Sequence, residues 1–303
     1  MPSGELSTIV AALTWAIASM MFRRLSARVS AFAMNVAKCA FAGTMLLVTR
    51  VLIGGEGPLS AVDPKAWAAL ASSSIVGLAI GDSAYFAAMA SLGVPRAILL
   101  LSSAPIFTAL GGVFLLNEPL GLRASPRDHH HARKGIALVV TRSTPSDEPS
   151  TRQPRASVAK GIAFGLVAAL AQAGGSLLSK GAMQAGIDPL AASVGRLFVA
   201  VVGLLGFGIV TGRLAIWARE LSTDRVMLKI SGASMLGTYL GIWLSQYAIQ
   251  HARSTGVAST LLATSPLFAL PLAHITGVER ATVRSVMGAI IALGGVTLLT
   301  VRF

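Results

Sequence analysis

The sequence predicts an all-α polytopic membrane protein, with about ten transmembrane helices in two inverted five-helix repeats. Hydrophobic residues make up 54% of its 303 residues, and the mean hydropathy is +0.71. Charged residues make up 12%, against about 25% in a typical soluble domain. Apolar runs long enough to cross a hydrocarbon core of roughly 30 Å recur along the whole chain. One long segment, residues 77–118, is also written a second time at 237–279.

The apolar runs are expected to be helices because the bilayer is their solvent. A bilayer offers no water to the backbone, so every N–H and C=O group must be paired within the protein. Long unbroken apolar runs satisfy that condition as helices. A transmembrane barrel would need alternating segments of about ten residues, which this sequence lacks.

The spans follow the apolar runs in chain order. They are expected at residues 6–22, 32–53, 67–90, 96–116, 158–179, 189–210, 228–249, 255–276 and 283–301, with a fifth span between 118 and 141. The tight turn SLGVP makes the third and fourth spans antiparallel neighbours. A polar stretch rich in Pro, Ser and Thr separates the halves. The predicted domains are therefore a first repeat at 1–141, a linker at 142–157 and a second repeat at 158–303.

The two long segments share their landmarks at matched spacing. Gly77 matches Gly237, Gly81 matches Gly241, and Pro105-x-Phe107 matches Pro266-x-Phe268. Lys38 matches Arg196 at an offset of 158 residues, which drifts only to 160 and 161 in the third and fourth spans of each half. Five spans per repeat would insert the second copy upside down. Inverted repeats are typical of secondary transporters, whose substrate sites lie near the midplane where the repeats meet.

The net charge of +13 does not indicate nucleic-acid binding. Lys and Arg fall in short loops between apolar runs, as in membrane proteins, and no basic patch is interleaved with aromatic residues. Their distribution over alternate loops leaves the orientation open. The single Cys39 lies in an apolar run, which excludes an intramolecular disulfide and gives no sign of a metal site. The first apolar run lacks a basic leader and is expected to be a span, not a signal peptide.

Three stretches resemble the EamA-type family of the drug/metabolite transporter superfamily. They read GELSTIVAALTWAIASMMFRR, GDSAYFAAMASLGVPRAILLLSSAPIFTALGGVFLLNE and MGAIIALGGVTLL. The resemblance covers nearly the whole chain as two EamA repeats. It implies a permease for small metabolites, often an exporter of amino acids or related compounds, in a bacterial plasma (inner) membrane. The expected partners are the lipid bilayer and a small-molecule substrate; a coupled proton and a homodimer stay open, and no cofactor is expected.

The fifth span departs from the pattern. Residues 122–134 are hydrophilic, with several Arg and Lys, three consecutive His and a Pro, although the spacing to the following apolar residues is preserved. The cations alone would cost on the order of 10 kcal/mol in a membrane. One interpretation is a local reading-frame change corrected downstream, which the clean recovery of register favours. The other is a genuine hydrophilic loop with a shortened fifth helix.

Charged residues inside spans are costly and usually functional. Asp82 lies deep in the third span and could carry a coupled proton, pair with a cationic substrate, or bond to Lys38 or a neighbouring helix. Lys38 and Arg196 occupy equivalent places, where they either line a substrate pathway or extend to the interface.

An aromatic and amide stripe marks the eighth span. Tyr239, Trp243, Gln246 and Tyr247 share one helical face by their spacing and are candidates for a wall of the substrate pathway, with packing as the alternative. The resemblance adds Trp15, Tyr85 and Gln172 to this set. Pro105 and Pro266 are expected to kink helices around a central cavity, and Glu118 and Glu279 to anchor loops.

Three functions compete at this point. A secondary transporter working by alternating access is the first, and a flippase for a lipid or lipid-linked sugar shares the expected fold. A membrane protein made inactive by the altered fifth helix is a further alternative. A membrane enzyme is disfavoured because Asp82 is the one acidic residue within a span. The sequence has no GxxxxGK[ST] loop, which argues against ATP as the driver.

Overall fold

The computed structural model describes residues 3–53, 63–104, 107–108, 110–112, 155–223, 225–251, 261–262 and 264–276. The named elements within these ranges are all helices, so the all-α prediction is confirmed there. Five continuous helical stretches in this part of the chain are long and apolar enough to cross a membrane: Leu6–Leu25, Ala31–Ile53, Pro64–Leu92, Val158–Gln184 and Pro189–Val210. The fifth and tenth spans, residues 122–134, Pro105, Glu118 and Glu279 lie outside the described residues, as does most of the linker. The number of ten helices and the inverted orientation stay predictions.

The helices follow the first, second, third, sixth, seventh and eighth predicted spans closely, and the fourth and ninth are described only in part. The first half contains α1 (Ser3–Leu25), α2 (Ala31–Ile53), α3 (Pro64–Ser73), η2 (Ser74–Asp82), α4 (Ser83–Leu92) and α5 (Val94–Leu101). The second contains α8 (Arg155–Gln184), α9 (Pro189–Val210), α10 (Leu214–Leu221), α11 (Val226–Ser234), η3 (Met235–Leu240), α12 (Gly241–His251) and α14 (Ser265–Ile275). The third predicted span is the continuous run α3–η2–α4, and the eighth is α11–η3–α12.

We call α3–η2–α4 and α11–η3–α12 the composite spans. Both contain a π-helical segment, which the sequence analysis did not predict. Residues 75–80 of η2 are the repeat counterparts of η3 at the offset of 160 residues. π-Helical turns are rare and frequently lie at functional sites, because the wider turn displaces side chains and frees carbonyl groups. The two halves therefore share a local distortion as well as a sequence.

The start of α9 is fixed by a cap and an ion pair. The side chain of Asp188 accepts from the backbone N–H of Ala191 at 2.8 Å, and Pro189 occupies the first turn. The other carboxylate oxygen of Asp188 lies 2.8 Å from the guanidinium of Arg50, near the end of α2. This contact fixes the end of α2 beside the beginning of α9.

Helix α10 is an element that the sequence analysis missed. It is too short to span a membrane, and it packs through Trp217, which is buried and stacks on Phe32 at 6.0 Å between ring centroids. The carboxylate of Glu220 accepts from the backbone N–H and the hydroxyl of Ser30, at 2.9 and 2.7 Å. These bonds satisfy donors at the start of α2, where the first turn has no intrahelical acceptors.

Pro266 does not kink a helix as predicted. It lies in the first turn of α14, where its missing N–H costs no hydrogen bond, so it marks a helix start. The proline inside α14 is Pro271.

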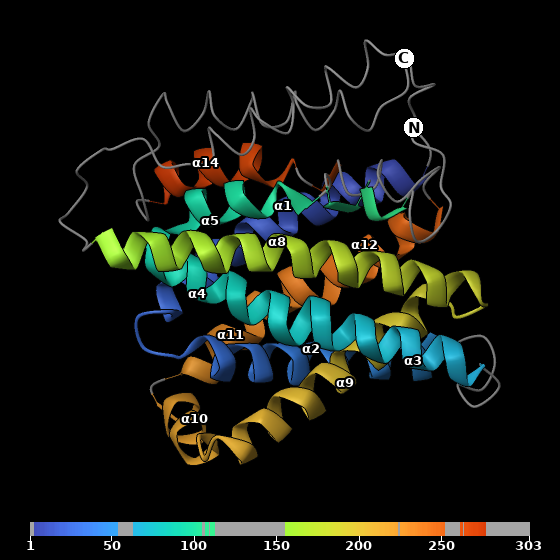
Figure 1. Cartoon of the computed structure of the whole chain (residues 1–303), viewed down its shortest axis with the longest axis horizontal. Helices are drawn as coiled ribbons and strands as arrows, with labels where there is room; N and C mark the ends of the chain where they lie inside the picture. Colours follow the sequence, from blue (N-terminus) through green and yellow to red (C-terminus); the bar gives the residue numbers. More distant parts are fainter. Residues whose placement is uncertain are drawn as a thin grey trace, which may run out of the picture.

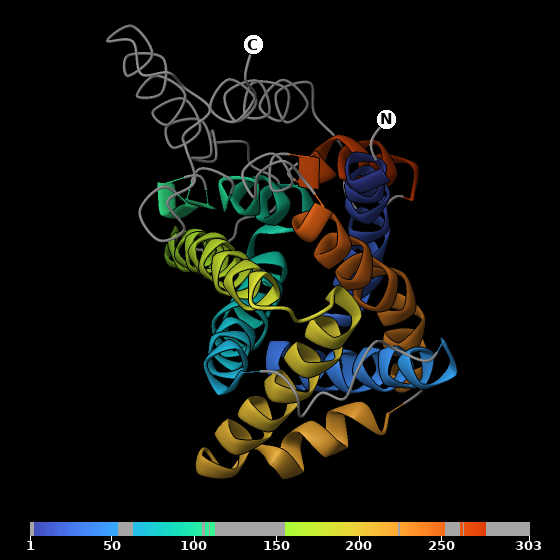
Figure 2. The ribbon, with the colours of Figure 1, turned by 90° about the vertical axis from the view of Figure 1, so that its right-hand side faces the viewer.

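The two halves pack on each other in an exchanged manner. Helix α8 runs along the whole of α3–η2–α4 (Figure 1), while α1 runs along α11–η3–α12 and lies beside α12 in the view of Figure 2. Helix α2 packs on α9. The first helix of each half thus covers the composite span of the other half, and neither half buries its apolar faces alone.

Glycines make both of these exchanged contacts possible. A Cβ on Gly175 of α8 would stand 2.7 Å from the Cα of Gly77 in η2, closer than real Cβ atoms approach. In the other half, a Cβ on Gly237 of η3 would stand 2.3 Å from the Cβ of Ala18 in α1. Small residues permit close helix approach in membranes, where packing supplies much of the association energy.

We expect Gly175→Ala to destabilise the fold by about 1–3 kcal/mol, because the added methyl group meets backbone atoms that cannot rotate away. Thermal unfolding of the purified protein in detergent measures this loss. Gly174→Ala is the matched control, since its Cβ would lie 3.5 Å from the nearest atom, a methyl carbon of Val76. Equal melting temperatures for the two variants would contradict the proposed close contact.

Candidate functional site

A cavity of about 110 Å³ lies between the two composite spans and the helices that cover them. Its lining comes from α1, α2, α5, α8, α9, α14 and both composite spans. A single water occupies roughly 10–15 Å³ on this measure, so the cavity holds a small solute or several waters.

Equivalent positions of the two halves line this cavity. The pairs are Trp15 with Gln172, Lys38 with Arg196, Leu78 with Thr238, Asp82 with Ile242, and Tyr85 with Ser245. The cavity therefore lies where the two copies of the repeated unit meet. This agrees with the general placement of transporter sites at a repeat interface.

The first cation of the site, Lys38, forms an ion pair with Asp82. Its side chain is 5% exposed, and that of Asp82 is 22% exposed, toward the cavity. The ammonium also lies 5.4 Å from the centre of the Phe86 ring, within the range of a cation–π contact. Lys38 is therefore paired inside the bundle of helices.

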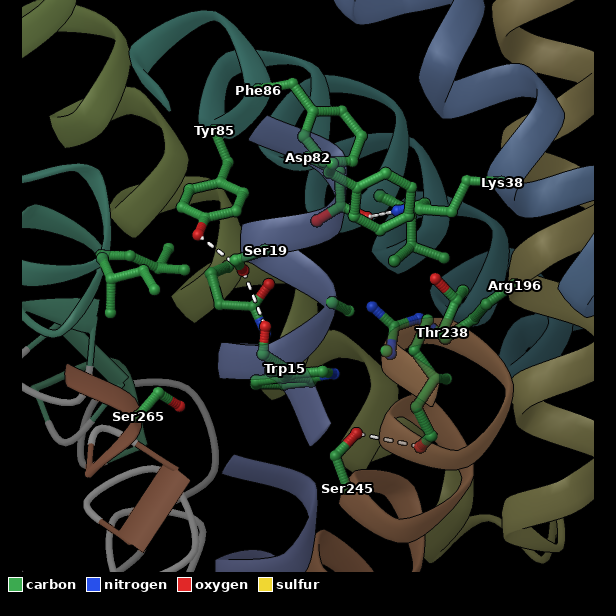
Figure 3. Close-up of a pocket in the computed structure, with 18 residues that line it drawn as sticks. Trp15, Ser19, Lys38, Asp82, Tyr85, Phe86, Arg196, Thr238, Ser245 and Ser265 are labelled. Carbon is green, nitrogen blue, oxygen red and sulfur yellow. Dashed lines mark hydrogen bonds and ion pairs between the residues drawn. The ribbon is translucent and has the colours of Figure 1, made fainter. Parts of the chain in front are cut away.

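The second cation, Arg196, is also buried but meets a neutral partner. Its Nη1 donates to the side-chain oxygen of Gln246 at 3.1 Å, and the amide nitrogen of Gln246 donates to the hydroxyl of Ser179 at 2.6 Å. Gln246 is fully buried, so this chain of bonds fixes the guanidinium from behind. In Figure 3, Lys38 and Arg196 extend from the same side toward the centre of the site.

An aromatic wall faces the two cations. The rings of Phe22 and Phe86 lie 5.1 Å apart, and that of Tyr85 lies 6.0 Å from Phe86. The hydroxyl of Tyr85 donates to Ser19 at 2.9 Å, and the hydroxyl of Ser19 donates to the carbonyl oxygen of Trp15 at 2.7 Å (Figure 3). The cavity thus offers apolar ring faces on one side and charges of both signs on the other.

Asn35 supports the π-helical segment that carries Asp82. Its amide nitrogen donates to the carbonyl oxygen of Leu78 at 2.8 Å and to the hydroxyl of Ser83 at 2.9 Å. Buried polar groups in a membrane protein must find partners within the protein, since no lipid group provides one. One turn before Lys38 on α2, Asn35 thus helps to hold both partners of the ion pair in place.

Six of the ten predicted pathway residues line the cavity: Trp15, Lys38, Asp82, Tyr85, Gln172 and Arg196. The four predicted on the eighth span do not. Tyr239 shares a hydrogen bond of 2.9 Å with Thr49 and packs with Trp243 on a cluster of α2 and α9 side chains, while the ring of Tyr247 stacks on His251 at 4.1 Å.

Other residues of the eighth span face the cavity instead. Thr238, Ile242 and Ser245 occupy the adjacent helical face, each one residue before a member of the predicted stripe. Residue type alone favoured the aromatic face. The repeat gave a better signal, since Ser245 and Thr238 are the counterparts of Tyr85 and Leu78 at the offset of 160 residues.

Metal-binding clusters are absent from the part of the chain that the structure describes: no three His, Cys, Asp or Glu residues gather there. Within the same ranges, Cys39 is buried and free.

The comparisons with known proteins match this architecture. The model of the EamA-like transporter family matches residues 2–124 and 159–301. The chain belongs to the EamA-like transporter family. The two matched segments confirm the predicted membership with two EamA repeats. The family consists of membrane transporters, so the chain is a multi-pass membrane protein of a transporter family, embedded in a lipid bilayer.

One solved crystal structure, described only as that of a protein, is similar over nearly its full length. The structural alignment covers 98% of this chain and 96% of the other chain, with a TM-score of 0.68 and 15% sequence identity. At that identity the likeness shows the fold alone. A comparison with curated proteins gives no match.

We expect Asn35→Leu to destabilise the protein by about 1–3 kcal/mol, because it removes the buried hydrogen bonds from Asn35 to the Leu78 carbonyl and the Ser83 hydroxyl. Thermal unfolding in detergent tests this. Ser193→Ala is the control at the equivalent repeat position, because among the described residues the Ser193 hydroxyl donates within its own helix, to the carbonyl oxygen of Pro189 at 2.7 Å. A larger loss for Ser193→Ala than for Asn35→Leu would exclude this role.

The Lys38–Asp82 ion pair gives a second stability prediction. Lys38→Met alone or Asp82→Leu alone leaves one charge without its partner and costs about 3–5 kcal/mol, toward the lower end because Asp82 is partly exposed. The double variant removes both charges, and we expect it to recover most of that loss in melting temperature. Additive losses in the double variant would show that the two residues do not interact.

Proposed function

We propose that this protein is a secondary transporter that moves a small polar metabolite, such as an amino acid or a related compound, by alternating access. The observation that carries the proposal is the cavity lined by equivalent positions of both halves, with Lys38, Asp82 and Arg196 held inside apolar spans. Charges are retained at such positions when they bind or relay something, because their burial is costly.

The packing of the halves supports alternating access. Each composite span crosses the first helix of the other half at glycines, where the two backbones come close together. Close backbone contacts at glycines allow one half to shift against the other about the fixed site. The π-helical segments lie in the same crossings, where a helix is most easily bent.

The direction is proposed to be export, in a bacterial plasma (inner) membrane, as the family resemblance implies. Asp82 is the group that would carry a coupled proton, since its carboxylate is partly exposed to the cavity. A homodimer is compatible with this proposal but is not needed for it, because one chain lines the cavity.

The alternatives predict different behaviour. A lipid flippase would act on amphiphiles, whereas the described cavity is small and its charged side chains come from the interior of the bundle. A chain made inactive by residues 122–134 would bind solutes without moving them.

Proteoliposomes containing the purified protein test the proposal. We expect a radiolabelled amino acid, among amino acids, polyamines and sugars, to exchange across the membrane when the same compound is present on the other side. Asp82→Asn is expected to lower the exchange rate at least tenfold, as removal of a group that acts in the transport step. Arg219→Gln, at an exposed position on α10, is the control and keeps the native rate. If no compound of the panel exchanges, the transport proposal fails.

A further inference from the structure

The two halves of the site differ in one charge. Lys38 and Arg196 are repeat counterparts, and both are buried beside the cavity. The composite span next to Lys38 offers Asp82, and one turn later Phe86. The counterparts of these two residues, next to Arg196, are Ile242 and Gln246. The first cation therefore has its own carboxylate, and the second has an isoleucine at the matching place.

The bonds of Arg196 leave donors unused. Among the described residues, its side chain donates to Gln246, while Nε is buried and has no partner. A guanidinium has five N–H donors and remains protonated in proteins. Gln246 is itself bonded to Ser179, so the group is oriented. No carboxylate of the described residues forms an ion pair with it: Asp82 lies close enough to act on Arg196 electrostatically, but its ion pair is with Lys38.

The charges around the cavity specify what would balance it. Lys38 and Asp82 cancel, which leaves Arg196 as one net positive charge among the described lining residues. A guanidinium fits a carboxylate with two parallel hydrogen bonds. A doubly charged phosphate would exceed the available positive charge and meet Asp82, so a singly charged anion fits better.

We propose that Arg196 binds the carboxylate of a monoanionic or zwitterionic solute in this cavity, and that Gln246 and Ser179 position the guanidinium for it. The inference rests on the proposed transport function for its setting. It assigns the missing countercharge of the second half to the substrate, whereas the first half carries its countercharge in the chain. Arg196 then determines specificity, and Ile242 keeps the place beside it free of a competing carboxylate.

Substitutions at Ile242 test this without removing Arg196. Ile242 lines the cavity one turn before Gln246 on the same helix, as Asp82 lies one turn before Phe86. Ile242→Asp places a carboxylate where the first half has one, and it should occupy the guanidinium in place of the solute. Ile242→Asn is the matched control, with nearly the same shape and no charge.

The probes are the common amino acids and, for each, the amide in which an uncharged carboxamide replaces the carboxylate. Binding to the full-length protein in detergent is measured by the rise in melting temperature with concentration. We expect at least one acid to stabilise the protein, and its amide to bind roughly thirtyfold more weakly or not at all. Ile242→Asp and Arg196→Gln should weaken the acid to the level of the amide, and Ile242→Asn should retain it.

Three results would overturn the inference: amides that stabilise as well as acids, no acid in the panel that stabilises, or native affinity in both Ile242→Asp and Arg196→Gln. The exchange assay separates it from the transport proposal. If polyamines or sugars exchange but no carboxylate does, the transporter stands and the role of Arg196 falls. If acids bind through Arg196 but nothing exchanges, the binding site stands and transport falls.

Discussion

The Lys38–Asp82 ion pair is the interaction on which the centre of this protein depends. A charge inside a membrane protein must be paired, hydrated or neutralised, and here the pairing determines which helices meet. It joins α2 to the end of η2, and Asn35 on the same helix donates to the carbonyl oxygen of Leu78 in the π-helical segment. The aromatic wall then packs around the ammonium through Phe86. Much of the site follows from satisfying one buried charge pair.

Close backbone contact is the second constraint, and it acts on the scaffold. Gly77 with Gly175 and Gly237 with Ala18 let the first helix of each half lie directly on the composite span of the other. Each half therefore contributes its first helix to the helical bundle of the other half. The cavity is bounded by those crossings, which explains why positions related by the repeat line it in pairs.

The spans and the repeat could be predicted from the sequence because both depend on patterns that are local or self-similar. Apolar length located α9 at both of its ends, and the offset between halves matched Lys38 with Arg196. The face of a helix that meets a cavity depends instead on its neighbours. An all-apolar span has little polarity to orient it, so Tyr239, Trp243 and Tyr247 drew attention by residue type while Ser245 and Thr238 line the site.

The π-helical segments were beyond prediction, since their wider turns depend on tertiary bonds such as that from Asn35. Helix α10 was missed because it is short and is held by Trp217 and Glu220, whose partners lie far away in the sequence.

The π-helical segments also carry information about history. A π-helical turn accommodates one more residue than an α-helical turn, and such a feature is lost by a single deletion. Both halves of the chain keep one at matching positions, although their side chains have diverged so far that an aspartate in one corresponds to an isoleucine in the other. A π-helical segment in the unit before its duplication would account for both copies. That segment would then be older than the difference between Asp82 and Ile242.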